Sequence, residues 1–203
     1  MCITLAVRRL VWMATDSFSK PCRGCVNTDL NMQNSGLTLN LGSGKDYKPD
    51  CVNADIRHDV GADWVVDIGA FMQIDRQFDR ILAFDVLEHI PNLVQAMTNC
   101  RDLLRDGGEM HIHVPYDLSL GAWQDPTHVR AFNEKSWVYY CDWAWYLGWK
   151  GSRFHLSHLE MRLSEYGASL KLPQEEILRL PRAVDSMYVI LKKVPYEDTS
   201  VAA

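Results

Sequence analysis

The chain has 203 residues and a net charge of −5, and hydrophobic residues make up 47% of it, which suits one domain with one sizeable core. An acidic chain without a basic stripe matches a phosphate backbone poorly, so we expect no nucleic-acid partner. No apolar stretch reaches the roughly 18–20 residues of a membrane helix, and we expect no membrane contact.

Residues 1–35 differ from the rest because they fit no long helical or strand period. We interpret them as a poorly ordered N-terminal appendage to a domain that spans residues 36–203. Cys22 and Cys25 form a C-x2-C pair, but no second pair completes a zinc site at a suitable spacing. The scattered cysteines and a start that makes a poor signal peptide predict a cytoplasmic protein.

Regular elements begin at residue 37. Short apolar runs bounded by turn residues predict strands over residues 37–41, 51–55, 64–67, 78–85, 109–114, 154–163 and 185–194. A helix that opens at Pro91 separates the fourth strand from the fifth, and the Gly-rich residues 106–108 predict a turn after it. Residues 117–150 are an aromatic-rich insertion. This order predicts an α/β fold with a Rossmann-like, doubly wound and mostly parallel sheet of about seven strands.

The first predicted strand ends in Gly42-Ser43-Gly44, and the second ends in Asp55, 13 residues after Gly42. Two close glycines allow a ligand to approach the backbone, and a carboxylate at the next strand end can accept hydrogen bonds from a ribose diol. Asp67 follows the third strand at the same rim, where it can reach an adenine amino group or be a solvated loop acid.

The short distance from Gly42 to Asp55 leaves no room for a full helix, and Pro49 disfavours one. The helix N-terminus that would hold a pyrophosphate is therefore absent from the pattern. This favours a cofactor with a ribose but no phosphate over a dinucleotide.

Residues 83–91 read Ala-Phe-Asp-Val-Leu-Glu-His-Ile-Pro, so a buried strand delivers Asp85, Glu88 and His89 to the same rim. With the Gly42–Gly44 turn and Asp55, this segment resembles class I S-adenosylmethionine (SAM)-dependent methyltransferases, especially a small bacterial and phage group with a shortened first helix. The resemblance covers roughly residues 37–115.

The resemblance implies SAM as the cofactor, and it implies cofactor contacts for nine residues: Asn40, Gly42, Ser43, Gly44, Asp55, Ile56, Asp67, Ile68 and Asp85. In that family the glycines hold the methionine part of SAM and the carboxylate matching Asp55 holds the ribose. Asp67 would flank the adenine, and Asp85 would lie under the methionine ammonium. Asn40 stands where the family usually has an acid, so we expect weaker cofactor binding.

The acceptor side is predicted from Asp125, His128 and Arg130, which follow the fifth strand in a string that resembles one found in a subset of these enzymes. Methyl transfer to a hydroxyl or ammonium needs a proton acceptor, and a histidine suits that task. We name His128 as the first candidate base, with Asp125 beside it, and His89 as the second. The same residues can instead pin the loop, which for Arg130 is the favoured interpretation.

His111 and His113 lie two apart on one strand and face the same side, but no compact ligand set accompanies them, so we predict no metal site. Residues 137–149 are dense in Trp and Tyr. They form a wall for a sugar-like acceptor, part of the core, or the face of a homodimer.

These patterns predict a SAM-dependent methyltransferase that acts on a small-molecule or glycan-like acceptor. One alternative is a non-catalytic SAM-binding or nucleotide-binding module, which would have no use for Asp125 and His128. The other is an NAD-dependent oxidoreductase, which the missing first helix disfavours.

Overall fold

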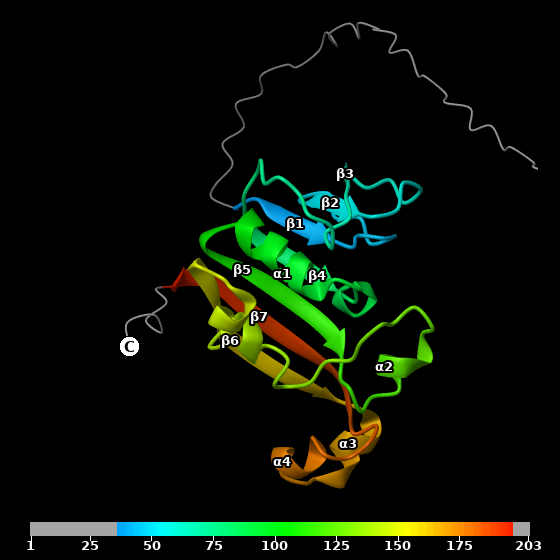
Figure 1. Cartoon of the computed structure of the whole chain (residues 1–203). Helices are drawn as coiled ribbons and strands as arrows, with labels where there is room; N and C mark the ends of the chain where they lie inside the picture. Colours follow the sequence, from blue (N-terminus) through cyan, green and yellow to red (C-terminus); the bar gives the residue numbers. More distant parts are fainter. Residues whose placement is uncertain (1–35, 197–203) are drawn as a thin grey trace, which may run out of the picture. The chain divides into compact units, whose positions relative to one another are not determined.

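The computed structural model describes residues 36–196, and Figure 1 shows their central twisted sheet. In this range the strands are β1 (Thr38–Leu41), β2 (Val52–Asp55), β3 (Trp64–Val65), β4 (Phe78–Phe84), β5 (Leu104–Pro115), β6 (Gly151–Leu163) and β7 (Val184–Tyr196). Their order is β3-β2-β1-β4-β5-β7-β6. Neighbours from β3 to β5 are parallel, and β7 is antiparallel to both β5 and β6. The predicted α/β class and mostly parallel sheet are confirmed, whereas the predicted appendage at residues 1–35 lies outside the described residues.

Helix α1 (Leu93–Leu103) is the long helix of the described chain, and it begins where Asn92 accepts a hydrogen bond from the Gln95 amide. Figure 1 shows α1 lying along the middle of the sheet. The shorter helices are η1 (Leu87–His89), α2 (Gly121–Gln124), η2 (Val138–Tyr140), η3 (Ala144–Leu147), α3 (Glu165–Leu170) and α4 (Gln174–Ile177). Among them none is long and apolar enough to cross a membrane.

Strand β5 is longer than its sequence pattern predicts, because it begins at Leu104 directly after α1. Its register with β4 shifts between the Phe78–Leu104 pair and the Arg80–Glu109 pair. Gly107 lies in this shifted stretch with a φ of 78°. The residues predicted as a turn are therefore an irregularity inside β5, which a left-handed glycine accommodates.

The core lies between α1 and one face of the sheet, where Met97, Cys100, Ile81, Ile112 and Val189 are fully buried. Alternate residues of β5 and β7 supply that face, as the two-residue period of a strand requires.

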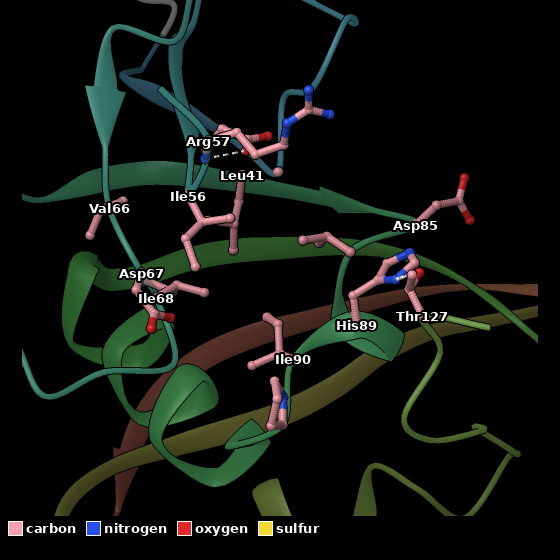
Figure 2. Close-up of a pocket in the computed structure, with 14 residues that line it drawn as sticks. Leu41, Ile56, Arg57, Val66, Asp67, Ile68, Asp85, His89, Ile90 and Thr127 are labelled. Carbon is pink, nitrogen blue, oxygen red and sulfur yellow. Dashed lines mark hydrogen bonds between the residues drawn. The ribbon is translucent and has the colours of Figure 1, made fainter. Parts of the chain in front are cut away.

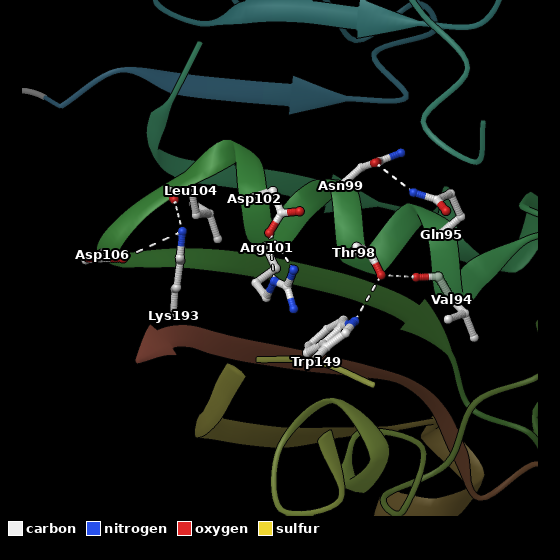
Figure 3. A network of polar contacts seen from close by, with 10 residues as sticks. All are labelled: Val94, Gln95, Thr98, Asn99, Arg101, Asp102, Leu104, Asp106, Trp149 and Lys193. Carbon is white, nitrogen blue, oxygen red and sulfur yellow. Dashed lines mark hydrogen bonds and ion pairs between the residues drawn. The ribbon is translucent and has the colours of Figure 1, made fainter. Parts of the chain in front are cut away.

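The aromatic insertion is divided between core and surface. Its buried members are Trp137, Tyr140 and Trp149, and its exposed members are Tyr139, Trp143, Trp145 and Tyr146. Figure 3 shows how Trp149 meets α1: its indole N–H donates to the Thr98 hydroxyl at 3.0 Å, and Arg101 lies 4.5 Å above the ring. The insertion thus covers the sheet face beside α1, and its exposed rings form a separate cluster.

Candidate functional site

The carboxyl ends of β1, β2, β3 and β4 enclose a pocket of about 640 Å³, a size typical of small-molecule sites. It lies where the strand order reverses between β1 and β4, the position at which open parallel sheets bind ligands. Its lining residues are Leu41, Gly42, Asp55, Ile56, Arg57, Val66, Asp67, Ile68, Asp85, Val86, His89, Ile90, Pro91 and Thr127.

Six of the nine residues that the sequence predicts for the cofactor line this pocket: Gly42, Asp55, Ile56, Asp67, Ile68 and Asp85. Figure 2 shows Ile56, Asp67 and Ile68 at one end and Asp85, His89 and Thr127 at the other. The other three predicted residues, Asn40, Ser43 and Gly44, lie outside the lining.

The Gly42–Gly44 turn is built on two left-handed glycines, with φ of 65° at Gly42 and 47° at Gly44. A β-carbon at position 42 would lie 2.5 Å from a methyl of Val86, whereas one at position 44 would meet only the Gly42 carbonyl, at 3.9 Å. The chain itself therefore requires glycine at position 42, because Val86 occupies the space that a side chain would need.

Asp55 fastens this turn from the end of β2. One carboxylate oxygen accepts the Gly44 amide at 2.8 Å, and the other accepts the Arg57 amide at 2.9 Å. Each oxygen keeps a second lone pair, so the carboxylate can still accept hydrogen bonds from a ligand in the pocket.

Asn40 is buried beneath the turn, and its side chain forms hydrogen bonds within the protein instead of lining the pocket. Its amide donates to the Asp46 carbonyl at 2.8 Å and to the Asn53 side chain at 2.9 Å. An acid at position 40 could not donate either bond, so the departure from the family pattern fits the local hydrogen bonding.

Asp85 follows β4 with a φ of 52°, a left-handed conformation that Asp tolerates better than most residues. Its carboxylate is 2.8 Å from Nδ1 of His113, whose Nε2 is 2.9 Å from the Ser186 hydroxyl. These contacts through His113 hold the otherwise exposed Asp85 carboxylate at the mouth of the pocket.

Among the described residues, His111 and His113 belong to no group of three possible metal ligands. Both ring nitrogens of His111 have partners, Tyr188 at 2.6 Å and Glu109 at 3.3 Å, and both of His113 are also engaged. Burial lowers the pKa of His111 and so favours its neutral form.

The predicted acceptor residues gather beside η1. The Thr127 hydroxyl donates to Asp125 at 2.7 Å, and its oxygen lies 2.9 Å from Nδ1 of His89. Hydrogen bonds from Thr127 hold the pKa of the Asp125 carboxyl below its usual value. His128 packs edge-on against His89, with ring centroids 4.6 Å apart.

The structure separates the two candidate bases. His89 lines the pocket, whereas the His128 side chain is only 7% exposed and is not among the lining residues. Arg130 holds the loop, because its guanidinium donates to the carbonyls of Ile90 and Pro91 at 2.8 and 2.7 Å. The loop-pinning interpretation of Arg130 therefore agrees with its contacts.

Two further residues shape the pocket without a signal in the sequence pattern. Thr127 lines the pocket and links His89 to Asp125, yet a threonine in a loop carries no spacing signal of its own. Asn99 of α1 donates to the carbonyls of Ile68 and Ala70 at 2.7 and 2.8 Å and so positions one wall. In the sequence, Asn99 lies on a helix whose apolar spacing indicates only core packing, so it was not predicted to shape the pocket.

Comparisons with known proteins agree with this architecture. Residues 44–112, about a third of the chain, match the family model described as a methyltransferase domain. No curated protein matches the sequence at a significant level.

Solved structures share the fold at low sequence identity. A SAM-dependent methyltransferase from Archaeoglobus fulgidus superposes with a TM-score of 0.53 at 17% identity, covering 76% of this chain and 85% of its own. Coclaurine N-methyltransferase, bound to N-methylheliamine and S-adenosylhomocysteine, gives 0.50 at 11% identity, with 79% and 68% covered. The cyclase SpnF gives 0.56 at 12%, with 80% and 76% covered. Because one of these folds carries a cyclase, the reaction must be argued from the site.

Proposed function

Because residues 44–112 match a methyltransferase domain model, we propose that the chain is a class I SAM-dependent methyltransferase that methylates a small-molecule or glycan-like acceptor at the His89 end of its pocket. The observation that carries the proposal is the pocket itself, where three strand-end carboxylates surround apolar walls and a histidine lies at one end. A cytoplasmic location is part of the proposal, and the free thiols of Cys51, Cys100 and Cys141 in the described chain support it.

The residues present suit SAM better than a dinucleotide. Asp55, Asp67 and Asp85 line the pocket, whereas the lining guanidinium, that of Arg57, is paired with Asp59 at 2.6 Å. Three carboxylates would repel a pyrophosphate but attract a cofactor that carries an ammonium and a sulfonium.

Each part of SAM then has a matching group. Ile56 and Ile68 offer apolar walls to the adenine, with Asp67 beside them. Asp55 retains lone pairs for the ribose hydroxyls, and Asp85 brings a negative charge for the ammonium.

SAM would supply an activated methyl carbon and leave as a neutral thioether. The acceptor's O–H or N–H bond breaks as its bond to carbon forms, so its proton must go to a neighbouring group or to water. In our proposal an imidazole takes that proton, and His89 is the better candidate because it lines the pocket whereas His128, which packs against it, does not.

The acceptor is best matched by an uncharged or cationic molecule. Arg130 is occupied by two backbone carbonyls, and the nearby Asp125 is anionic. An acidic or phosphorylated acceptor would therefore find no free cationic side chain among the residues that line the pocket and its His89 end.

The test begins with calorimetric titration of S-adenosylhomocysteine into the chain and its Asp55→Ala variant, with the exposed Asp75→Ala as a matched control. We expect saturable binding that Asp55→Ala weakens and Asp75→Ala leaves unchanged. No binding by the folded wild-type chain would overturn the proposal.

Transfer is then measured in single turnovers with radiolabelled SAM and an acceptor found by screening. We expect His89→Ala to slow transfer about 100-fold or more without changing S-adenosylhomocysteine affinity, with a smaller effect for His128→Ala and none for the exposed His155→Ala. Saturable binding without transfer to any acceptor would favour the non-catalytic module, and normal transfer by His89→Ala would exclude it as the residue that acts on the proton.

A further inference from the structure

Glu88 is a buried acid with no partner. Its side chain belongs to η1 and is 1% exposed, and neither carboxylate oxygen has a hydrogen-bond partner within residues 36–196. Native proteins rarely leave a buried carboxylate unsatisfied, so this residue calls for a partner other than residues 36–196.

Two imidazoles face this acid. One ligand atom each from Glu88, His89 and His128 lie within 4.8 Å of one another. The loop that carries His128 is docked on η1, because the Val129 amide donates to the Glu88 carbonyl at 2.9 Å. Two segments distant in sequence are thus held together at this point.

The hydrogen bonds of the two imidazoles leave one nitrogen of each ring available. Nδ1 of His128 is 3.0 Å from the Ala122 carbonyl, which can only accept, so this nitrogen carries the proton. The Thr127 hydroxyl donates to Asp125, so Thr127 is left to accept from Nδ1 of His89. In neutral rings both Nε2 atoms then carry a free lone pair, the arrangement found in metal-ligating histidines.

From these observations we infer that Glu88, His89 and His128 form a binding site for one divalent transition-metal ion. Two imidazoles and one carboxylate suit Zn²⁺, Fe²⁺, Mn²⁺ or Co²⁺, whereas Mg²⁺ and Ca²⁺ prefer oxygen ligands alone. Ligand atoms around zinc are roughly 3–3.5 Å apart, so small side-chain rotations would draw this set together. The cation would satisfy the orphaned carboxylate.

The site has a role that rests on the proposed function. His89 and Thr127 line the pocket, so the cation would lie beside the acceptor end. A hydroxyl acceptor bound to it would lose its proton to water more readily, which makes the imidazole pair act through the metal. The proposed metal site does not depend on this role, because it is inferred from the arrangement of Glu88, His89 and His128 alone.

The experiment measures metal binding without any acceptor. The full chain carries Cys22→Ser and Cys25→Ser, which remove the closely spaced thiol pair. It is stripped with a chelator and titrated with Co²⁺ by calorimetry and visible absorption. We expect one Co²⁺ per chain with a ligand-field spectrum. Glu88→Gln and His128→Gln should each weaken binding about 100-fold, whereas the exposed His155→Gln should leave it unchanged.

Folding and cofactor binding are followed in parallel. Circular dichroism checks that each variant is folded. If a variant does not fold, thermal unfolding of the wild-type chain with and without Co²⁺ replaces it, and we expect a higher Tm with the metal. No Co²⁺ binding by the folded wild-type chain, or wild-type affinity for Co²⁺ in Glu88→Gln and His128→Gln, would overturn the site. Titration with S-adenosylhomocysteine distinguishes the metal site from the proposed function. If the chain binds S-adenosylhomocysteine but not Co²⁺, only the metal site is excluded. If it binds Co²⁺ but not S-adenosylhomocysteine, only the proposed function is excluded.

Discussion

Gly42 and Val86 come from different strand ends and pack so closely that a β-carbon on residue 42 would lie 2.5 Å from the Val86 side chain. Gly42 also has a φ of 65°, a region costly for other residues. The pocket therefore depends on a contact between the β1 turn and the segment after β4.

Gly42→Ala should lower the free energy of unfolding by about 2–4 kcal/mol, because it adds steric overlap to backbone strain. It should also weaken S-adenosylhomocysteine binding, since both residues line the pocket. Denaturant unfolding and calorimetry measure the two effects.

The control is Gly44→Ala, which carries only the strain of a φ of 47° and should cost about 1–2 kcal/mol. Val86→Ala in the Gly42→Ala background should restore part of the loss. Equal costs for the two glycines and no rescue would show that the close contact is not what requires Gly42.

The fold followed from sequence because strand periodicity and strand-end motifs are local signals. Gly42, Asp55 and Asp85 were found in this way, since parallel strands bring their carboxyl ends together. The grouping of Glu88, His89 and His128 could not be predicted, because Glu88 and His128 are forty residues apart and meet only through the docked loop. The resemblance alone named Asn40 as a cofactor contact, and its hydrogen bonds to the Asp46 carbonyl and the Asn53 side chain could not be predicted from sequence because they depend on the folded turn.

Asp85→Asn should weaken S-adenosylhomocysteine binding about tenfold while leaving stability nearly unchanged. Asn tolerates the φ of 52° at this position as well as Asp does, so the variant removes a charge without new strain. Calorimetry measures the affinity, and the exposed Asp75→Asn is the matched control. Unchanged affinity would mean that the ammonium relies on other groups.

Alkaline pH should destabilise the chain through its buried thiols. Burial raises the pKa of Cys100 to about 12, so between pH 9 and 12 the thiol ionises in the unfolded state but not in the folded one. The contribution of this protonated thiol to the free energy of unfolding is therefore complete below pH 9 and is lost as the pH rises from 9 to 12.

Cys100→Ala tests whether Cys100 causes this pH dependence of stability. In this window the slope of unfolding free energy against pH should become shallower by about 1.4 kcal/mol per pH unit, although the variant is less stable at pH 7. Urea unfolding at several pH values measures the slope, and Cys51→Ala, at a half-buried position, should change it less. Parallel curves for wild type and Cys100→Ala would contradict the prediction.

The aromatic insertion yields a matched pair of tryptophans. Trp149 is 4% exposed and donates to Thr98, whereas Trp145 is 52% exposed in the cluster with Tyr139, Trp143 and Tyr146. Trp149→Phe should lower stability by about 1–2 kcal/mol, because it removes the hydrogen bond and weakens the contact with Arg101. Trp145→Phe should leave stability unchanged.

The exposed cluster is also our proposed homodimer contact at residues 137–149, since gathered exposed aromatic rings are typical of protein interfaces. Trp145→Glu should therefore shift the chain toward the monomer in sedimentation velocity at matched concentration, because it would bury a charge in that contact. The equivalent exposed substitution outside the cluster, Trp123→Glu, should not. A wild-type chain that sediments as a monomer at all concentrations would exclude the dimer and leave this surface for the acceptor or another partner.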